Sequence, residues 1–257
     1  MAPPDYSFTR RPRWIAGHLI ALVAIVVFVL AGLWQLSRLA EQRSTNDTVR
    51  ARALGAAIDL PSPPASAAEI ADLEWQLVEF EARWLQQDEV ILRARSLGGV
   101  SGHDILTPAT VGDITVIVNR GWVPIDIEDP PVELAAPAAA RTVVRGVLRP
   151  TQERGSFGPV DPDEGRLARI ARVDLDRLDQ QISGDLYPMW VQLLEQDPAQ
   201  ANYPRVRSLP PLDDGPHLSY AVQWFVFATV VVVGYPVLLI RTARTNEPER
   251  RRRRVEG

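Results

Sequence analysis

The stretch PHLSYAVQWFVFATVVVVGYPVLLI, residues 216–240, decides the fold of this chain, because it contains no charged side chain between Leu218 and Ile240. A helix over this range rises about 1.5 Å per residue and is long enough to cross the hydrocarbon core of a bilayer. Its first turns are polar and aromatic, and helical spacing places His217, Tyr220 and Trp224 on one face. The sequence therefore predicts a membrane helix that opens with a cluster of candidate functional side chains.

A second apolar run covers Trp14–Leu36. It is too long for the apolar core of a signal peptide, which is the alternative, and WQLSR follows it where a small-residue cleavage site would stand. We therefore expect a second membrane helix that the mature protein retains.

Charge predicts the topology. Residues 1–36 and 218–257 together hold 10 arginines and 4 acidic residues, whereas residues 37–217 hold 18 arginines and 28 acidic residues. Arginine next to membrane helices stays on the cytoplasmic side, so both ends are expected inside and the middle outside, although Arg38 and Arg43 weaken this slightly. The expected divisions are a cytoplasmic tail (1–13), a transmembrane helix (14–36), an extracytoplasmic β-rich domain (37–217), a second transmembrane helix (218–240) and a cytoplasmic basic tail (241–257).

The middle domain reads as a mainly antiparallel α+β domain, either an open sheet or a small barrel. A helical extension over residues 38–54 and a Pro- and Ala-rich tether near residues 60–69 precede it. Alternating apolar residues and turn signals predict strands at 78–84, 90–95, 105–106, 114–118, 142–148, 169–173 and 189–194. A short helix over 175–182 is expected after Asp174, an N-cap residue.

Composition excludes several functions. The chain has no cysteine, so disulfides, thiolate metal sites and cysteine catalysis are excluded. No catalytic constellation occurs, so the protein is not expected to be an enzyme. The acidic middle domain disfavours nucleic acid as a partner. His103 reads as a polar loop residue, and the DPDEG at residues 161–165 reads as a solvated turn in preference to a calcium loop.

Three short stretches carry the candidate functional residues: GLWQLSR (32–38), VNRGWVP (118–124) and PHLSYAVQW (216–224). Tryptophan at a membrane boundary and arginine at a helix end each have ordinary interfacial explanations. Both helices nevertheless carry a Trp–Gln pair at the same expected depth. Glutamine in lipid needs a hydrogen-bond partner, so Gln35 and Gln223 are expected to bond across the helices or to a ligand.

In this order, the stretches resemble the surfeit locus protein 1 family, assembly factors of haem A-containing cytochrome c oxidase. The residues that carry the resemblance are Gly32, Trp34, Gln35 and Arg38, then Gly102, Thr107 and Pro108, then Asn119–Trp122, and finally His217, Leu218, Tyr220, Ala221, Trp224 and Phe225. Two positions depart from the family pattern. Gly215-Pro216 stands where two asparagines are usual, and Gln42, followed by Arg43, stands where a basic residue is usual. The absence of lysine indicates a bacterium with a high-GC genome.

The resemblance implies a non-enzymatic chaperone of the respiratory chain that delivers haem A to the oxidase core subunit, with haem A synthase as a further partner and the lipid bilayer around it. It implies haem binding by His217, as iron ligand, and by Trp224. Arg38 is then a candidate partner for a haem propionate. The full candidate haem site is His217, Trp224, Tyr220, Arg38, Trp34, Gln35 and Gln223.

His18 is excluded as a second ligand of the same iron, because it lies near the other end of its helix, about 27 Å from Leu36. Two alternatives from other classes remain open. One is a cofactor-free stabiliser or accessory subunit of the oxidase or of a respiratory supercomplex. The other, an external sensor domain, is disfavoured because the expected tails hold no output domain.

Overall fold

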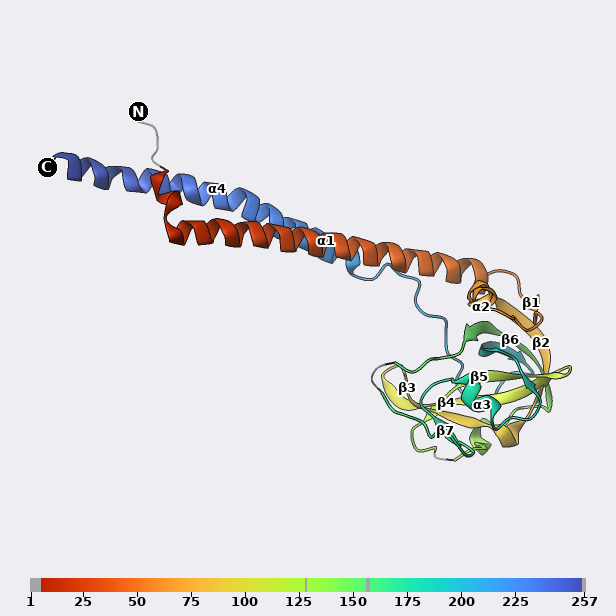
Figure 1. Cartoon of the computed structure of the whole chain (residues 1–257). Helices are drawn as coiled ribbons and strands as arrows, with labels where there is room; N and C mark the ends of the chain where they lie inside the picture. Colours follow the sequence, from red (N-terminus) through yellow and green to blue (C-terminus); the bar gives the residue numbers. More distant parts are fainter. Residues whose placement is uncertain (1–5, 128, 156–157, 256–257) are drawn as a thin grey trace. The chain divides into compact units, whose positions relative to one another are not determined.

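The structure is a computed structural model that describes residues 6–127, 129–155 and 158–255 (Figure 1). The chain divides into two compact units. The helix pair consists of Met1–Asn46 and Leu212–Gly257, and the β domain consists of Asp47–Pro211.

The helix pair contains a short 3-10 helix η1 (Ser7–Arg10), most of α1 (Pro12–Ala53) and α4 (His217–Val255). Both long helices are long and apolar enough to cross a membrane. Only 11% and 6% of the residues in their apolar windows are buried within the protein. The core helix of a soluble protein would bury far more, so the exposed apolar faces need an apolar environment outside the chain.

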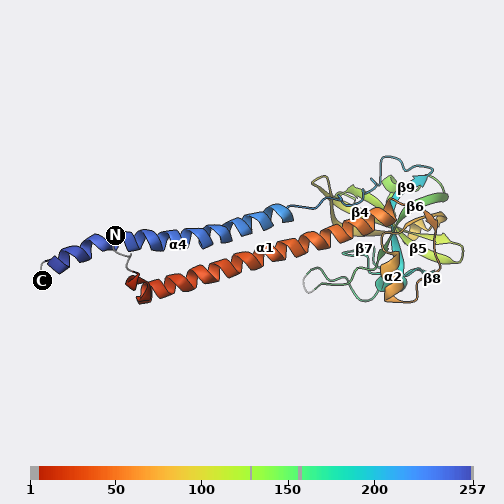
Figure 2. The same ribbon diagram turned by 90° about the horizontal axis from the view of Figure 1, so that it is seen from above.

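The two helices run antiparallel and side by side (Figures 1 and 2). Gly32 of α1 faces Phe225 of α4 so closely that a Cβ atom on Gly32 would lie 2.8 Å from the phenylalanine ring. About one turn before Gly32, Phe28 stacks on Trp224 with ring centroids 5.7 Å apart. A small residue opposite a large one is what brings two apolar helices into van der Waals contact in the absence of a hydrophobic driving force.

The β domain is built on a nine-stranded mixed sheet. Its strands are β1 (Ile58–Asp59), β2 (Leu77–Trp84), β3 (Val90–Leu97), β4 (Val100–Val111), β5 (Ile114–Pro124), β6 (Arg141–Pro150), β7 (Arg169–Ile170), β8 (Asp185–Leu186) and β9 (Met189–Asp197). The smaller helices of this unit are α2 (Ala67–Leu73), η2 (Gln86–Asp88), η3 (Glu133–Ala135) and α3 (Leu175–Asp179).

The sheet closes into a small barrel. Its path runs β1-β2-β6-β9-β5-β4-β3-β7, and β2 also pairs with β4. Strands β2, β6, β9, β5 and β4 therefore form a ring, which settles the choice between an open sheet and a barrel. In β2 every second side chain from Val78 to Trp84 is buried, and these side chains face the barrel core with Val118, Val144 and Leu148.

The long ladders of the sheet are antiparallel, as expected, and four two-residue pairings, β1–β2, β3–β7, β5–β8 and β5–β9, are parallel and make the sheet mixed. Several other sequence predictions for this domain are corrected. The strand predicted at 169–173 ends at Ile170, and α3 ends at Asp179 and not at Ile182. The Pro- and Ala-rich stretch at 60–69 contains the start of α2, where Ser66 accepts a hydrogen bond from the Glu69 amide.

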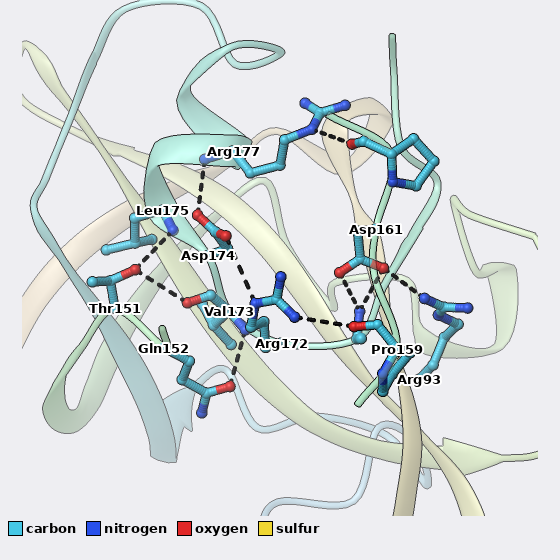
Figure 3. A network of polar contacts seen from close by, with 12 residues as sticks. Arg93, Thr151, Gln152, Pro159, Asp161, Arg172, Val173, Asp174, Leu175 and Arg177 are labelled. Atoms are coloured by element: carbon cyan, nitrogen blue, oxygen red, sulfur yellow. Dashed lines mark hydrogen bonds and ion pairs between the residues drawn. The ribbon is translucent and has the colours of Figure 1, made fainter. Parts of the chain in front are cut away.

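The DPDEG segment is fastened to β7 and α3, as Figure 3 shows. Buried Asp161 accepts hydrogen bonds from the Ala171 amide at 3.1 and 2.9 Å and from Arg93 at 2.5 Å. Arg177 donates to the carbonyls of Pro162 and Gly165, while Asp174 caps α3 by accepting from the Arg177 amide. Asp161 thus has a structural role, whereas residues 162–165 are exposed and bend at 163–165, as expected of a solvated turn.

Candidate functional site

The centre of the candidate site is a hydrogen bond between the two helices. The imidazole Nδ1 of His217, the first residue of α4, lies 3.0 Å from Oε1 of Gln35 on α1. A carbonyl oxygen only accepts hydrogen bonds, so Nδ1 is the donor of this bond, and in the neutral ring Nε2 then carries the lone pair. Among the described residues no group hydrogen-bonds to Nε2.

The remaining candidates on α4 lie beside or below this pair. Tyr220, one turn after His217, is 48% exposed. Trp224 packs against Phe28 and meets Phe227 edge-on at 5.9 Å. Gln223 is exposed and forms no hydrogen bond to any described residue. The expected interhelical bond therefore involves Gln35 and His217, and does not involve Gln223.

The two other candidates on α1 form no ring contact, hydrogen bond or ion pair with the described residues of α4. Trp34 is 59% exposed and has no ring partner among the described residues. It follows Gly32 by two positions, so helical geometry turns it away from the face that meets Phe225. Arg38 is exposed and pairs with Glu41 on its own helix. The structure therefore joins His217 to Gln35 and turns Trp34 away from α4, while Arg38, one turn after Gln35 on the same side of α1, pairs with Glu41.

A clamp that the sequence reading missed holds the start of α4. Arg43 donates two hydrogen bonds to Oδ2 of Asp214, at 3.0 and 2.6 Å. Asn46 donates to the carbonyl of Asp213 at 2.8 Å, and Gly215 adopts a positive φ of +61° that turns the chain into the helix. Gly215 stands at one of the two departures from the family pattern and Arg43 next to the other, at Gln42, so the chain has a local geometry of its own here.

The opposite end of the helix pair has its own polar contact. His18 Nδ1 lies 2.8 Å from the Tyr235 hydroxyl, and His18 Nε2 lies 3.3 Å from the Thr9 carbonyl oxygen. Both ring nitrogens of His18 are thus engaged, which leaves it no lone pair for a metal at this position. This contact ties η1 to both helices.

The motif residues of the β domain are buried, and they pack against or hydrogen-bond to other residues of the domain. A Cβ atom on Gly102 would lie 2.4 Å from the indole nitrogen of Trp122, so only glycine fits beside this ring. Asn119 donates to Asp104, whose carboxylate also accepts two bonds from Arg207 at 2.8 and 2.7 Å. These contacts show why glycine stands at position 102 and asparagine at position 119: both residues are needed for the fold, and no ligand has to be invoked.

A fully buried ion pair links Arg120 of the VNRGWVP stretch to Glu89, which directly precedes β3. Arg120 Nη1 lies 3.8 Å from Oε2 of Glu89, and both side chains are 0% exposed. Thr107 and the Val132 amide donate to Glu89, while Arg120 donates to the Ala135 carbonyl at 2.6 Å. Burial lowers the pKa of Arg120 to about 10. Burial also raises the pKa of Glu89, and this effect outweighs the hydrogen bonds to Glu89 and the charge of Arg120, which lower that pKa.

His103, expected in a loop, lies instead in strand β4 and is 5% exposed. Its Nε2 lies 2.9 Å from Nη2 of Arg169, so it accepts from the guanidinium. Burial and, to a lesser extent, Arg169 lower the pKa of His103, so this imidazole is neutral at pH 7. It has the role of a buried structural histidine.

The described residues hold no cluster of three or more His, Cys, Asp or Glu side chains that could bind a metal ion. A haem iron needs only one protein ligand on a face, and neutral imidazole with a free Nε2 supplies it. His217 fits that requirement, because Gln35 occupies Nδ1 and leaves Nε2 uncommitted. His18 and His103 do not fit it.

Two membrane-length helices near the two ends of the sequence, with a small mixed β barrel between them in the chain, define the class of the protein: a β-barrel protein with two apolar helices and an interhelical histidine. The chain belongs to the SURF1 family, whose model matches residues 22–229. This confirms the resemblance found in the sequence.

The relatives span bacteria and animals. An uncharacterised SURF1-like protein of Mycobacterium tuberculosis is 26% identical over 243 residues, covering 90% of this chain and 85% of the relative. A SURF1-like protein of Rickettsia felis is 24% identical, covering 86% and 95%. Surfeit locus protein 1 of Takifugu rubripes is 27% identical, covering 54% and 64%. The mycobacterial relatives agree with a high-GC bacterial origin.

Proposed function

We propose that this protein is a non-enzymatic assembly factor for haem A-containing cytochrome c oxidase, and that it holds haem A transiently for insertion into the oxidase core subunit. Membership of the SURF1 family supports the assembly role. The observation that carries the haem role is the His217–Gln35 hydrogen bond, which leaves His217 Nε2 available to iron at the start of a membrane-length helix.

The position of His217 suits an amphipathic ligand. When bound, haem A supplies the iron that His217 would coordinate, with its propionates in the polar interface and its apolar tail in lipid. Arg38 is the candidate propionate partner. Its present partner Glu41 is exposed, with side chains 52% and 61% accessible, and an exposed pair contributes only about 0–1 kcal/mol, so exchange for a propionate costs little.

A membrane location with both ends in the cytoplasm is part of the proposal. It is supported by the two apolar helices and by the arginine-rich ends, which follow the positive-inside rule. An alkaline phosphatase fusion after Pro130 should be active, and one after Arg244 should be inactive. The reverse pattern would contradict the topology and with it the external position of His217.

The cellular test is deletion of the protein in its host. Oxidase activity should fall and the high-spin haem signal of the oxidase should weaken, while haem A synthesis continues. An unchanged oxidase content and spectrum in the deletion strain would rule out an assembly role.

Site variants test the haem role in protein co-expressed with haem A synthesis. His217→Ala should abolish or shift the Soret band. Trp224→Ala should weaken binding by less, because a stacking contact contributes about 1 kcal/mol beyond its buried area. Arg38→Ala should reduce haem retention without changing the iron ligand field. His18→Ala and His103→Ala are the matched controls and should leave the spectrum unchanged.

The alternative function is a cofactor-free stabiliser or accessory subunit of the oxidase or of a respiratory supercomplex. The same hydrogen bond supports it, because a His–Gln bond also ties two membrane helices together without any ligand. Purified protein that lacks any haem spectrum after co-expression, combined with a loss of oxidase on deletion, would favour this alternative.

A further inference from the structure

The environment of the His217 ring is asymmetric. On one side, Nδ1 faces the side-chain amide of Gln35. On the other side, Gly215 lies close to the ring: a Cβ atom on Gly215 would lie 3.5 Å from Cδ2 and 3.7 Å from Nε2, which are ordinary van der Waals distances. The φ of +61° at residue 215 is a conformation that favours glycine.

The chemistry of the two partners determines which ring nitrogen of His217 carries the proton. Neutral imidazole carries a single N–H, and the Gln35 carbonyl oxygen can only accept. The bond therefore selects the tautomer protonated at Nδ1 and also restricts rotation of the ring. Metal-bound histidines generally have such a second partner, which fixes the tautomer and raises ligand basicity.

We infer that Gln35 is a positioning residue for His217: it holds the imidazole as the Nδ1–H tautomer with Nε2 presented to the haem iron, and does not itself touch the haem. The clamp of Arg43, Asn46, Asp213 and Asp214 supports this by fixing where α4 begins, and so the height of His217 opposite Gln35. The part of this inference that concerns iron rests on the proposed function. The part that concerns the tautomer of His217 does not depend on the proposed function.

The first test needs no haem. The chain has 3 histidines, so ¹⁵N-histidine labelling of the full-length protein in detergent gives a spectrum simple enough to assign with His18→Ala and His103→Ala. In the neutral ring, wild-type His217 should be almost wholly the Nδ1–H form. In Gln35→Leu the Nε2–H form should become the major species.

Two further variants distinguish a specific effect of Gln35 on the His217 ring from a general disturbance of the helix pair. Gln35→Glu keeps an acceptor and should retain the Nδ1–H tautomer. Gln223→Leu removes a glutamine from the opening turns of α4 that has no bond to His217, and should leave the tautomer unchanged. A wild-type tautomer in Gln35→Leu, or an equal change in Gln223→Leu, would overturn the inference.

The second test uses the haem-loaded protein. A carboxylate accepts the Nδ1 proton more strongly than an amide, so Gln35→Glu should lower the midpoint potential of the bound haem, and Gln35→Leu should raise it. A changed tautomer in the haem-free protein with an unchanged potential would overturn the link to iron. Absence of haem from wild-type protein would refute the proposed function and the link to iron, but would leave the tautomer result standing.

Discussion

The helix pair and the β domain both contain residues typical of the SURF1 family, but the two units use them differently. In the β domain Gly102, Thr107 and Arg120 are buried, and each has a packing or hydrogen-bond partner that accounts for its type. In the helix pair His217 is only partly buried, and one of its ring nitrogens has no partner among the described residues. The comparison shows that the motif residue whose type is not accounted for by packing lies in the helix pair, and this is why the candidate site is placed there.

The largest expected effect tests the claim that the barrel motifs are structural. Arg120→Ala leaves the Glu89 carboxylate buried without its counter-charge, which should cost about 3–5 kcal/mol of the free energy of unfolding. Arg141→Ala, in the exposed pair with Glu81, should cost at most about 1 kcal/mol. Denaturant unfolding of the full-length protein in detergent, followed by tryptophan fluorescence, measures both. Equal costs would contradict a structural role for the buried pair.

A somewhat smaller loss is expected from Gly102→Ala. The new methyl group would lie 2.2 Å from the Val123 carbonyl oxygen and 2.4 Å from the Trp122 indole nitrogen, so β4 and β5 must move apart, at a cost of about 3 kcal/mol. Gly112→Ala is the control: its φ is +60° but nothing lies within 4 Å, so about 1 kcal/mol is expected. The same unfolding experiment should rank the two variants in this order.

In the helix pair, Gly32→Leu should weaken packing by about 1–3 kcal/mol, because its side chain would overlap the Phe225 ring. The cysteine-free chain allows a direct measurement through oxidative cross-linking of Arg43→Cys with Asp214→Cys. Gly234→Leu, which meets no atom within 4 Å, should leave the cross-link yield unchanged. A loss of yield in both variants would indicate a general effect of added bulk.

The smallest effect is expected from Tyr187→Phe in the β domain. Tyr187 is fully buried and its hydroxyl has no partner among the described residues, so its removal should change stability at pH 7 by less than about 1 kcal/mol. Burial raises the pKa of Tyr187 to about 12, above the unfolded value of 10.0, so the folded state binds more protons between these values. Stability of the wild type should therefore fall as the pH rises from about 10 to about 12, and the phenylalanine variant should lose less across that window.

Local patterns predicted much of the fold. Alternation from Val78 to Trp84 predicted β2, and the N-cap Asp174 predicted the start of α3. The capping signature at Ser66 and Glu69 was also present in the sequence, but proline and alanine around it favoured an irregular tether. Closure of the barrel through β2 and β4 could not be predicted, because that pairing depends on sheet curvature and on no local signal.

The site was predicted less completely than the fold. The expected shared depth of the two motifs correctly suggested that polar side chains of both helices would meet. It did not distinguish Gln35 from Gln223 as the partner, because both are glutamines next to tryptophan. The Arg43–Asp214 clamp and the Glu89–Arg120 pair join residues far apart in the chain, and a single sequence carries no signal for such pairs.

The order of strands in the barrel has a consequence for synthesis of the protein. Strand β9 is the last to leave the ribosome, yet it lies between β6 and β5. Until it is in place, β5 and β6 each expose an unpaired edge, and such edges promote aggregation. The nascent chain must therefore reach residue 197 before the domain can close. A premature stop codon before β9 should accordingly yield an aggregating product and not a shortened, functional protein.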